Sequence, residues 1–368
     1  MAKLPEQPKD SATVQAIYRA YEQSESRRVS RRLGASQIGK ACERSLWYGF
    51  RHCQPVGLSF NGRMLRLFDT GHREEPRMLD DLRAIGCEAH AGDPATGEQF
   101  EFTDIAGHFV CKIDGACIGL PEAPKAWHAC EFKTHSAKSF RELVKKGLEQ
   151  AKPEHFAQLI TGMALSGMKR GLYLAKNKDT DELYSERLRW EQVREHWDRL
   201  RDRAQRVTQS ATPPERISDD RTSFACRFCD FNDVCHGSDP PKAAVPCKVS
   251  CRNCVHATPE MDADARWSCS KRGVTLTLDD QQRACPEHLF IPDLVTFADV
   301  VDAGYDPAGD WTEYQNTEGG AVWRQGKQEG QYSSEELTRL PGPLVGAGLV
   351  DEAKEALGAV VMEVGDEV

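Results

Sequence analysis

The stretch "HACEFKTHS", residues 128–136, places an acid and a base two residues apart inside an otherwise apolar segment. Glu131 and Lys133 flank Phe132, and side chains at positions i and i+2 of a strand point to the same face of a sheet. Burying a carboxylate and an ammonium group on one face costs free energy unless each finds a partner. The stretch therefore predicts a strand with a polar site on one face.

The segments around this stretch predict a mixed sheet flanked by helices, which is an α/β fold. Further strand candidates with short apolar runs are residues 107–113, 115–120, 126–133, 170–176 and 182–189. Helices are expected at residues 63–84, 136–150, 153–167 and 190–210.

Individual residues in these helices predict where each one begins, bends or ends. Pro76 predicts a kink in the first helix, and Ser139 with Glu142 has the spacing of a capping box. Pro153 suits a first helical turn, and Gly167 suits a helix end.

The length of 368 residues allows two or three domains. We expect a polar and helical arm at 1–33, an α/β domain at 34–237, a cysteine-rich module at 245–292 and an acidic tail region at 293–368. No run of about 18 apolar residues is present, and the N-terminus "MAKLPEQPKD" is polar. We therefore expect a cytoplasmic protein, in the host cytoplasm if a phage encodes it, with no membrane partner.

The charge of the chain is distributed unevenly. The net charge is −9, but residues 291–368 contain 16 acidic and 4 basic side chains, so the remainder is net positive. Between Arg19 and Arg66, ten Lys and Arg residues stand against three Glu. A local basic stretch matters more to a polyanion than the overall sum does. This stretch is either a nucleic-acid surface or a solvated helical face.

Asp114 is a candidate partner for Glu131 and Lys133. It ends the strand candidate "GHFVCKID" and precedes Glu131 by 16 intervening residues, so two adjacent strands can bring the three side chains together. Two converging carboxylates repel each other unless a cation lies between them, and hard oxygen ligands suit Mg²⁺ or Mn²⁺. A neighbouring lysine can orient a water or stabilise developing negative charge. The pattern indicates metal-dependent phosphodiester hydrolysis, with an ordinary cross-strand ion pair as the alternative.

A second carboxylate candidate lies in "TGHREEPRML", residues 70–79. Gly71 would allow close approach of the backbone, and Glu75 could reach the metal from the side. Glu74 and His72 are the alternatives to Glu75.

Three polar residues beyond the Glu-x-Lys strand complete the candidate site. Gln158 lies on a following helix and could contact a phosphate or the nucleophilic water, or could be a surface glutamine. Lys176 and Lys178 end a strand candidate and could bind a DNA backbone, or could belong to a polar hairpin turn.

These residues resemble a known family. Gly71-x-x-x-Glu75, Asp114, Glu131-x-Lys133 and Gln158 occur in the order seen in PD-(D/E)XK nucleases, and the RecB-like exonuclease branch is the most similar. That branch often has a tyrosine four residues after the glutamine, where this chain has Gly162. It also often has a metal-binding histidine where Glu75 falls, which makes this chain more similar to phage-type exonucleases.

The first cysteine set is Cys226-x2-Cys229-x5-Cys235, which His236 could complete as a zinc site. Far upstream, Cys42 precedes an Arg- and aromatic-rich helix. One N-terminal cysteine plus a C-terminal triplet resembles the iron–sulfur signature that AddB-type nuclease domains share with the CRISPR-adaptation exonucleases. The resemblance implies a [4Fe–4S] cluster on Cys42, Cys226, Cys229 and Cys235 that clasps the two ends of the nuclease domain.

The second cysteine set is Cys251-x2-Cys254-x14-Cys269-x15-Cys285. Four cysteines in this pattern indicate a tetrahedral structural zinc site, which a segment poor in aliphatic residues needs in order to fold. Cys247 and His288 could replace one ligand. A DNA-contacting finger is the alternative, with support from Arg252, Lys271 and Arg272.

The resemblance covers about residues 34–237 and implies a metal-dependent DNA exonuclease of recombination or repair, encoded by a phage or prophage. Asp114 and Glu131 would hold Mg²⁺ or Mn²⁺ with Glu75 in support, and Lys133 would position the water. Partners would be single-stranded or duplex DNA ends and a recombination protein, and the stretch from Arg19 to Arg66 with Trp47 and Tyr48 would guide the strand. The alternatives are a catalytically silent DNA-binding scaffold and a redox-sensing iron–sulfur protein.

Overall fold

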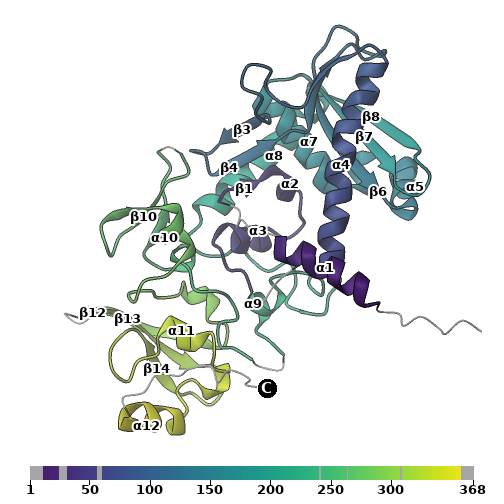
Figure 1. Ribbon diagram of the computed structural model, residues 1–368. Coiled ribbons are helices and arrows are strands. Elements are labelled where there is room, and N and C mark those ends of the chain that lie inside the picture. Colours follow the sequence, from purple (N-terminus) through teal and green to yellow (C-terminus); the bar gives the residue numbers. More distant parts are fainter. Residues whose placement is uncertain are drawn as a thin grey trace, which may run out of the picture. The chain divides into compact units, whose positions relative to one another are not determined.

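The computed structural model describes residues 11–24, 31–55, 60–239, 242–262, 264–306 and 309–357. The chain divides into two compact units, each built from separate pieces of the sequence (Figure 1). Unit 1 comprises Met1–Val29, Ser59–Phe102 and Cys111–Leu200, and unit 2 comprises Ser30–Leu58, Thr103–Val110 and Arg201–Val368. The expected domain at 34–237 is thus divided between both units.

Unit 1 is built on a five-stranded sheet with the order β2-β5-β6-β7-β8. The strands are β2 (Glu88–His90), β5 (Gly115–Ile118), β6 (His128–His135), β7 (Arg170–Asn177) and β8 (Leu183–Arg189). β6 and β7 pair in parallel, and the other three pairs are antiparallel. The prediction of a mixed sheet flanked by helices is confirmed.

The helices of unit 1 follow the sequence signals closely. They are α1 (Ala12–Ser24), α4 (Gly62–Ala84), α5 (Ala137–Lys146), α6 (Leu148–Ala151), α7 (Pro153–Ser166) and the first part of α8 (Trp190–Gln209). Pro76 lies inside α4, which continues through it, and Gly167 ends α7 with a left-handed φ of 76°. The expected cap at Ser139 is wrong: Ser136 is the N-cap of α5, and its hydroxyl accepts a hydrogen bond from the Ser139 backbone N–H.

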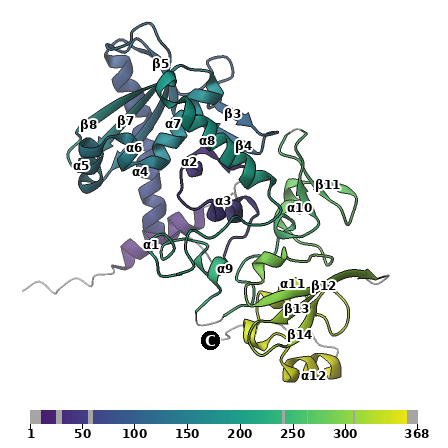
Figure 2. The same cartoon turned by 180° about the vertical axis from the view of Figure 1, so that it is seen from behind.

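The two faces of the central sheet have different neighbours. On one face Cys130, Phe132 and Leu172 pack in a buried cluster with Met78 and Leu79 of α4. The opposite face carries the side chains that alternate with these, and α7 packs against it. Seen from opposite sides, Figures 1 and 2 show α4 in front of the sheet in one view and α7 in front in the other. The polar face of β6 therefore lies under α7.

Unit 2 contains short elements with a core rich in aromatic and guanidinium groups. Its elements up to residue 294 are β1 (Leu33–Gly34), α2 (Ala35–Ile38), α3 (Glu43–Phe50), α9 (Asn232–His236), η1 (Cys251–Asn253), β9 (Ala257–Pro259), β10 (Trp267–Cys269), β11 (Val274–Leu276), α10 (Leu278–Gln282) and η2 (Pro292–Leu294). Two strands, β3 (Glu101–Asp104) and β4 (Phe109–Lys112), span the boundary between the units. The buried guanidinium groups of Arg51 and Arg252 lie over the ring of Trp267, at 5.2 and 4.6 Å from its centroid.

This core overturns one expectation about DNA contacts. Trp47 and Tyr48 are both buried, at 0 and 1% exposure, and the Trp47 indole N–H donates a hydrogen bond to the Ser210 carbonyl. Arg51 is buried as well. These side chains hold unit 2 together, so the proposal that Trp47 and Tyr48 guide a DNA strand is wrong. Arg27 and Arg28 of the same basic stretch lie outside the described residues.

We expected residues 293–368 to form an acidic tail region, but the described part of this region is folded into strands and helices. It contains β12 (Ala298–Asp306), β13 (Gly309–Asn316), β14 (Val322–Gln325), α11 (Ser334–Leu337), η3 (Gly342–Leu344) and α12 (Gly348–Leu357). The three strands form an antiparallel sheet whose buried Tyr314 and Trp323 rings stack at 4.7 Å. In β13, buried side chains alternate with less buried ones from Thr312 to Asn316, and acids such as Glu313 occupy the less buried positions. The high acid content of the region hid this alternation in the sequence. Residues 358–368 lie outside the described residues.

Within the described ranges, none of the helices combines the length and the apolar character that crossing a bilayer requires.

Candidate active site

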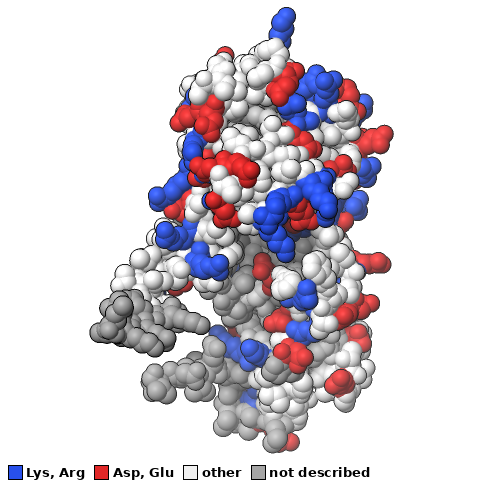
Figure 3. Space-filling model, turned by 90° about the vertical axis from the view of Figure 1, so that its right-hand side faces the viewer, with Lys and Arg blue, Asp and Glu red and all other residues white. Residues whose placement is uncertain are grey.

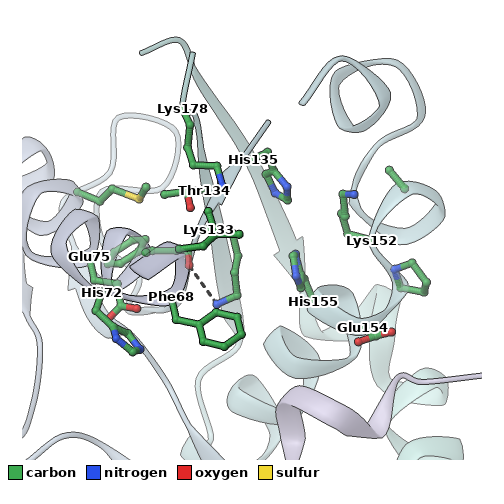
Figure 4. A pocket seen from close by; sticks show the side chains of 16 residues that line it. Phe68, His72, Glu75, Lys133, Thr134, His135, Lys152, Glu154, His155 and Lys178 are labelled. Atoms are coloured by element: carbon green, nitrogen blue, oxygen red, sulfur yellow. Dashed lines mark hydrogen bonds between the residues drawn. The ribbon is translucent and has the colours of Figure 1, made fainter. Parts of the chain in front are cut away.

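A cavity of about 940 Å³ lies in unit 1 beside the polar end of β6 (Figure 4). It is lined from α4, β6, the start of α7 and the β7–β8 hairpin, by Leu67, Phe68, Gly71, His72, Glu75, Met78, Phe132, Lys133, Thr134, His135, Ala151, Lys152, Pro153, Glu154, His155 and Lys178. Segments that are far apart in the sequence thus bring Gly71, His72, Glu75 and Lys133 together, as the sequence pattern predicts.

Asp114, Glu131 and Lys133 form one hydrogen-bonded group next to this cavity. The Lys133 ammonium lies 3.4 Å from Asp114 Oδ2 and forms an ion pair with Glu131. The same Oδ2 atom accepts a hydrogen bond of 2.7 Å from the Phe132 backbone N–H. Glu131 is 1% exposed, whereas Lys133 reaches the cavity. The predicted grouping of the two acids with the lysine is present in the structure.

Burial and the mutual charge interactions of these side chains shift the pKa values of Glu131 and Lys133. Burial raises the pKa of Glu131 to about 8, although the charge of Lys133 opposes the rise. Burial by itself would lower the pKa of Lys133, but the neighbouring Glu131 and Asp114 outweigh it and hold that pKa above its usual range. A bound divalent cation would favour the ionised form of a carboxyl group buried in this way.

The structure distinguishes Glu75 from Glu74. Glu75 lines the cavity, and its pKa is raised by burial and by the nearby charge of Asp114. Glu74 instead accepts a hydrogen bond of 2.8 Å from the ammonium group of Lys176, which is itself buried. Glu74 thus pairs with Lys176, which also forms an ion pair with Asp181. Glu75 and Lys178 instead line the cavity. His72 also lines the cavity beside Glu75.

The position of Gln158 differs from the expectation. It is half-buried on α7 and is not among the residues that line the cavity. Gly162, one turn later, packs so closely that a Cβ atom there would lie 2.7 Å from Ile113 Cγ2. This side of α7 leaves no room for a tyrosine at position 162.

A chain of hydrogen bonds at one wall of the cavity was not predicted from the sequence. The Tyr173 hydroxyl lies 2.9 Å from His135 Nε2 and 2.8 Å from His155 Nδ1, and His135 Nδ1 lies 3.1 Å from Ser139 Oγ. His135 follows Glu131 and Lys133 at every second position of β6, so strand alternation could have identified it. Tyr173 is directly opposite Glu131 in the β6–β7 register, which no local signal reveals.

The first cysteine set comes together in unit 2. Cys42, Cys226, Cys229 and Cys235 line one small cavity, and His236 lines it too. Cys42 occupies the N-cap position of α3, and Cys235 lies in α9, so the structure joins segments separated by more than 180 residues. An all-thiolate set fits an iron–sulfur cluster, and the same set with or without His236 fits zinc.

The second cysteine set also shares one cavity, lined by Cys251, Cys254, Cys269 and Cys285. The spare His288 also lines this cavity, but both of its ring nitrogens have other partners: Nδ1 lies 2.7 Å from Ser334 Oγ, and Nε2 lies 3.0 Å from the Ser250 carbonyl oxygen. The four thiols that line this cavity are a donor set that suits tetrahedral zinc.

Two other residues near the second set have partners of their own. Cys247 is buried beside Cys53 and accepts a hydrogen bond from the Asn253 amide. Arg252 was one of three residues that supported a DNA-contacting finger as the alternative. It is buried against Trp267 and donates a hydrogen bond to the Phe50 carbonyl, so it cannot contact DNA there.

All fourteen cysteines fall in the described ranges and are free. As the side chains stand, the described part of the chain contains no group of three or more His, Cys, Asp or Glu arranged to hold a metal ion. The donor chemistry of the carboxylate group and of both cysteine sets nevertheless matches the metals expected for them.

The surface shows no single basic face in the view of Figure 3, where Lys and Arg side chains form separate groups with acids between them. Many exposed bases are paired locally, as in the bidentate contact of Arg206 with Glu43 at 3.0 and 3.1 Å. Around the cavity, three lysines supply local positive charge: Lys133, Lys152 and Lys178.

The sequence matches no protein-family model and no curated protein sequence. Weak likenesses to solved structures exist. The crystal structure of SSO0001 aligns with 61% of this chain and 96% of its own, at 12% identity and a TM-score of 0.36. An alkaline exonuclease from Laribacter hongkongensis, LHK-Exo, covers 52% of this chain and 89% of its own at 13% identity and a TM-score of 0.34. The same enzyme in complex with dAMP gives 15% identity and a TM-score of 0.32 over the same shares.

Proposed function

We propose that this chain is a metal-dependent deoxyribonuclease that hydrolyses phosphodiester bonds from DNA ends, as an exonuclease of the PD-(D/E)XK type. The observation that carries the proposal is the joining of Asp114, Glu131 and Lys133 beside a cavity that also takes in Glu75. We assign the activity to DNA recombination or repair in a phage or prophage, on the basis of the sequence resemblance alone.

Asp114 and Glu131 would hold Mg²⁺ or Mn²⁺, with Glu75 as a third oxygen donor. The bound ion would supply Lewis-acid stabilisation of the phosphate and a more acidic water. The ammonium of Lys133 would then orient the attacking water and offset the charge that develops on the phosphate oxygens. The water oxygen forms a bond to phosphorus, the bond to one bridging ester oxygen breaks, and that oxygen takes a proton from solvent while the water loses one.

The two cysteine sets would have structural roles. Cys42, Cys226, Cys229 and Cys235 would hold a [4Fe–4S] cluster, and Cys251, Cys254, Cys269 and Cys285 would hold zinc. Each set joins segments with few aliphatic side chains, so metal binding would contribute directly to the folding free energy of unit 2.

Digestion of matched linear and covalently closed circular DNA by anaerobically purified protein with Mn²⁺ tests the proposal. An end-dependent nuclease consumes the linear DNA and spares the circle, and end labels on either strand report the polarity. Equal loss of both substrates would replace the exonuclease with an endonuclease. DNA binding without loss of either substrate would support a catalytically silent scaffold instead.

A further inference from the structure

The wall of the cavity opposite Glu75 carries a polar group that the mechanism above does not use. His155 lines the cavity from α7 together with Lys152, and Lys178 lines it from the β7–β8 hairpin (Figure 4). Lys133 is close enough that its charge, after burial, contributes most to lowering the pKa of His155 to about 3. His155 is therefore a neutral imidazole beside three lysines.

Contacts with Tyr173, on the side of the ring away from the cavity, fix the orientation of His155. Its Nδ1 lies 2.8 Å from the hydroxyl of Tyr173, which is 0% exposed, and the two rings stack at 5.9 Å. Nε2 is on the opposite side of the ring, and within the described part of the chain it forms no hydrogen bond. Because Nδ1 is hydrogen-bonded to a buried hydroxyl, the ring cannot turn freely, and Nε2 is held at a defined place in the cavity wall.

The hydrogen-bond chain has two consistent directions. A hydroxyl has one hydrogen, so Tyr173 donates to one of its two histidines and accepts from the other. If Ser139 donates to His135 and His135 donates to Tyr173, then Tyr173 donates to His155 Nδ1 and the proton of His155 is on Nε2. The reverse direction leaves Nε2 as an acceptor. Three ammonium groups around the cavity favour an anionic occupant, and an anion selects the direction in which Nε2–H donates.

Gln158 was the residue expected to contact the phosphate or the water, and its side chain does not line the cavity. His155 lies three positions earlier on the same helix, which places it on the same face of α7 one turn closer to the cavity. We propose that His155 donates a hydrogen bond from Nε2 to a non-bridging oxygen of the DNA phosphate that is cleaved, with Tyr173 and His135 as positioning residues. The inference rests on the proposed nuclease function.

Variants at position 155 can distinguish the role of Nε2 from that of Nδ1. A glutamine at position 155 places an amide N–H near the site of Nε2, whereas an asparagine places its polar group near Nδ1. Removing one preorganised donor to a developing charge typically lowers kcat about 10²-fold. We expect His155→Ala and His155→Asn to lower kcat about 10²-fold with KM nearly unchanged, and His155→Gln to recover at least about tenfold of that loss.

Tyr173→Phe tests the positioning role, because it removes only the hydroxyl. We expect it to lower kcat about tenfold in the wild-type background and to have no further effect in His155→Ala, since residues acting as a unit are not additive. His196→Ala is the matched control: this histidine lies on α8, packs against Phe156 and is outside the cavity lining. Its kcat should equal that of the wild type.

The outcomes separate the two proposals. Wild-type cleavage with an unaffected His155→Ala, or equal loss in His155→Gln and His155→Asn, would overturn the role of His155 and leave the nuclease standing. A larger loss in Gln158→Ala than in His155→Ala would return the contact to Gln158. Absence of metal-dependent cleavage by the wild type would remove the nuclease proposal and this inference together.

Discussion

The carboxylate of Asp114 accepts a hydrogen bond of 2.7 Å from the backbone N–H of Phe132, the residue that separates Glu131 from Lys133. Asp114 is directly before β5, and its own backbone N–H donates to the Cys130 carbonyl of β6 at 3.1 Å. The acid is thus fastened by two bonds to the strand that carries the other two groups. The spacing of Asp114, Glu131 and Lys133 is a property of the sheet and not of flexible side chains alone.

Asp114→Asn and Asp114→Ala separate charge from hydrogen bonding at this position. The asparagine oxygen can still accept the bond from Phe132, so we expect its free energy of unfolding in urea to be near that of the wild type. The alanine variant loses the bond and should be less stable by about 1 kcal/mol. Both lack the negative charge that a cation needs, so both should lose at least about 100-fold in cleavage rate, or roughly 3 kcal/mol. An active Asp114→Asn would exclude Asp114 as a metal ligand.

Glu75→Gln and Glu74→Gln are a matched pair on adjacent positions of α4. Glu75 faces the cavity, so its variant should need a higher Mn²⁺ concentration for half-maximal cleavage. Glu74 pairs with Lys176, so its variant should keep the wild-type Mn²⁺ requirement and lose about 1 kcal/mol of stability. Titration of cleavage rate against Mn²⁺ measures the first effect, and urea unfolding measures the second. The reverse pattern would make Glu74 the ligand.

Gly162→Ala should destabilise unit 1 because its Cβ atom would lie 2.7 Å from Ile113 Cγ2. Overpacking of this kind costs about 1–3 kcal/mol, measurable by urea unfolding. Gly71→Ala is the control, since a Cβ atom there has no neighbour within 4 Å and alanine favours a helix by about 0.5–1 kcal/mol. Equal stability of the two variants would contradict the close packing of α7 on this part of the sheet.

The two cysteine sets should bind different metals independently. Cys226→Ser should lower the iron content of anaerobically purified protein and leave its zinc content unchanged. Cys251→Ser should do the opposite, so each variant is the control for the other. Elemental analysis of both proteins checks this. Zinc without iron in the wild type, lost in Cys226→Ser, would assign zinc to the first set as well.

Much of unit 1 could be predicted from the sequence because its signals are local. The short apolar runs of β6 and β7, the Pro153 start and the Gly167 end of α7 all depend on residues within one element. The grouping of Asp114, Glu131 and Lys133 was accessible because two neighbouring strands bring them together.

The remaining features depend on contacts between distant residues. Tyr173 reaches the site through strand register, and His155 through the depth at which α7 packs on Gly171. Trp47 is a residue type that often contacts DNA, but in the structure it is buried in unit 2 and bonded to Ser210. No local sequence pattern indicates that burial. Only the packed structure decides whether an arginine or an aromatic ring serves the core or the surface.

The most direct measurement is the rate of cleavage of end-labelled linear DNA with Mn²⁺ by the wild type, by Lys133→Ala and by Lys112→Ala. Lys112 is the matched control, because it is exposed on β4 and pairs with Glu101 outside the cavity. The proposed role of Lys133 predicts cleavage by the wild type and Lys112→Ala and a loss of at least about 100-fold in Lys133→Ala, with DNA binding retained. Cleavage by Lys133→Ala at the wild-type rate would contradict it.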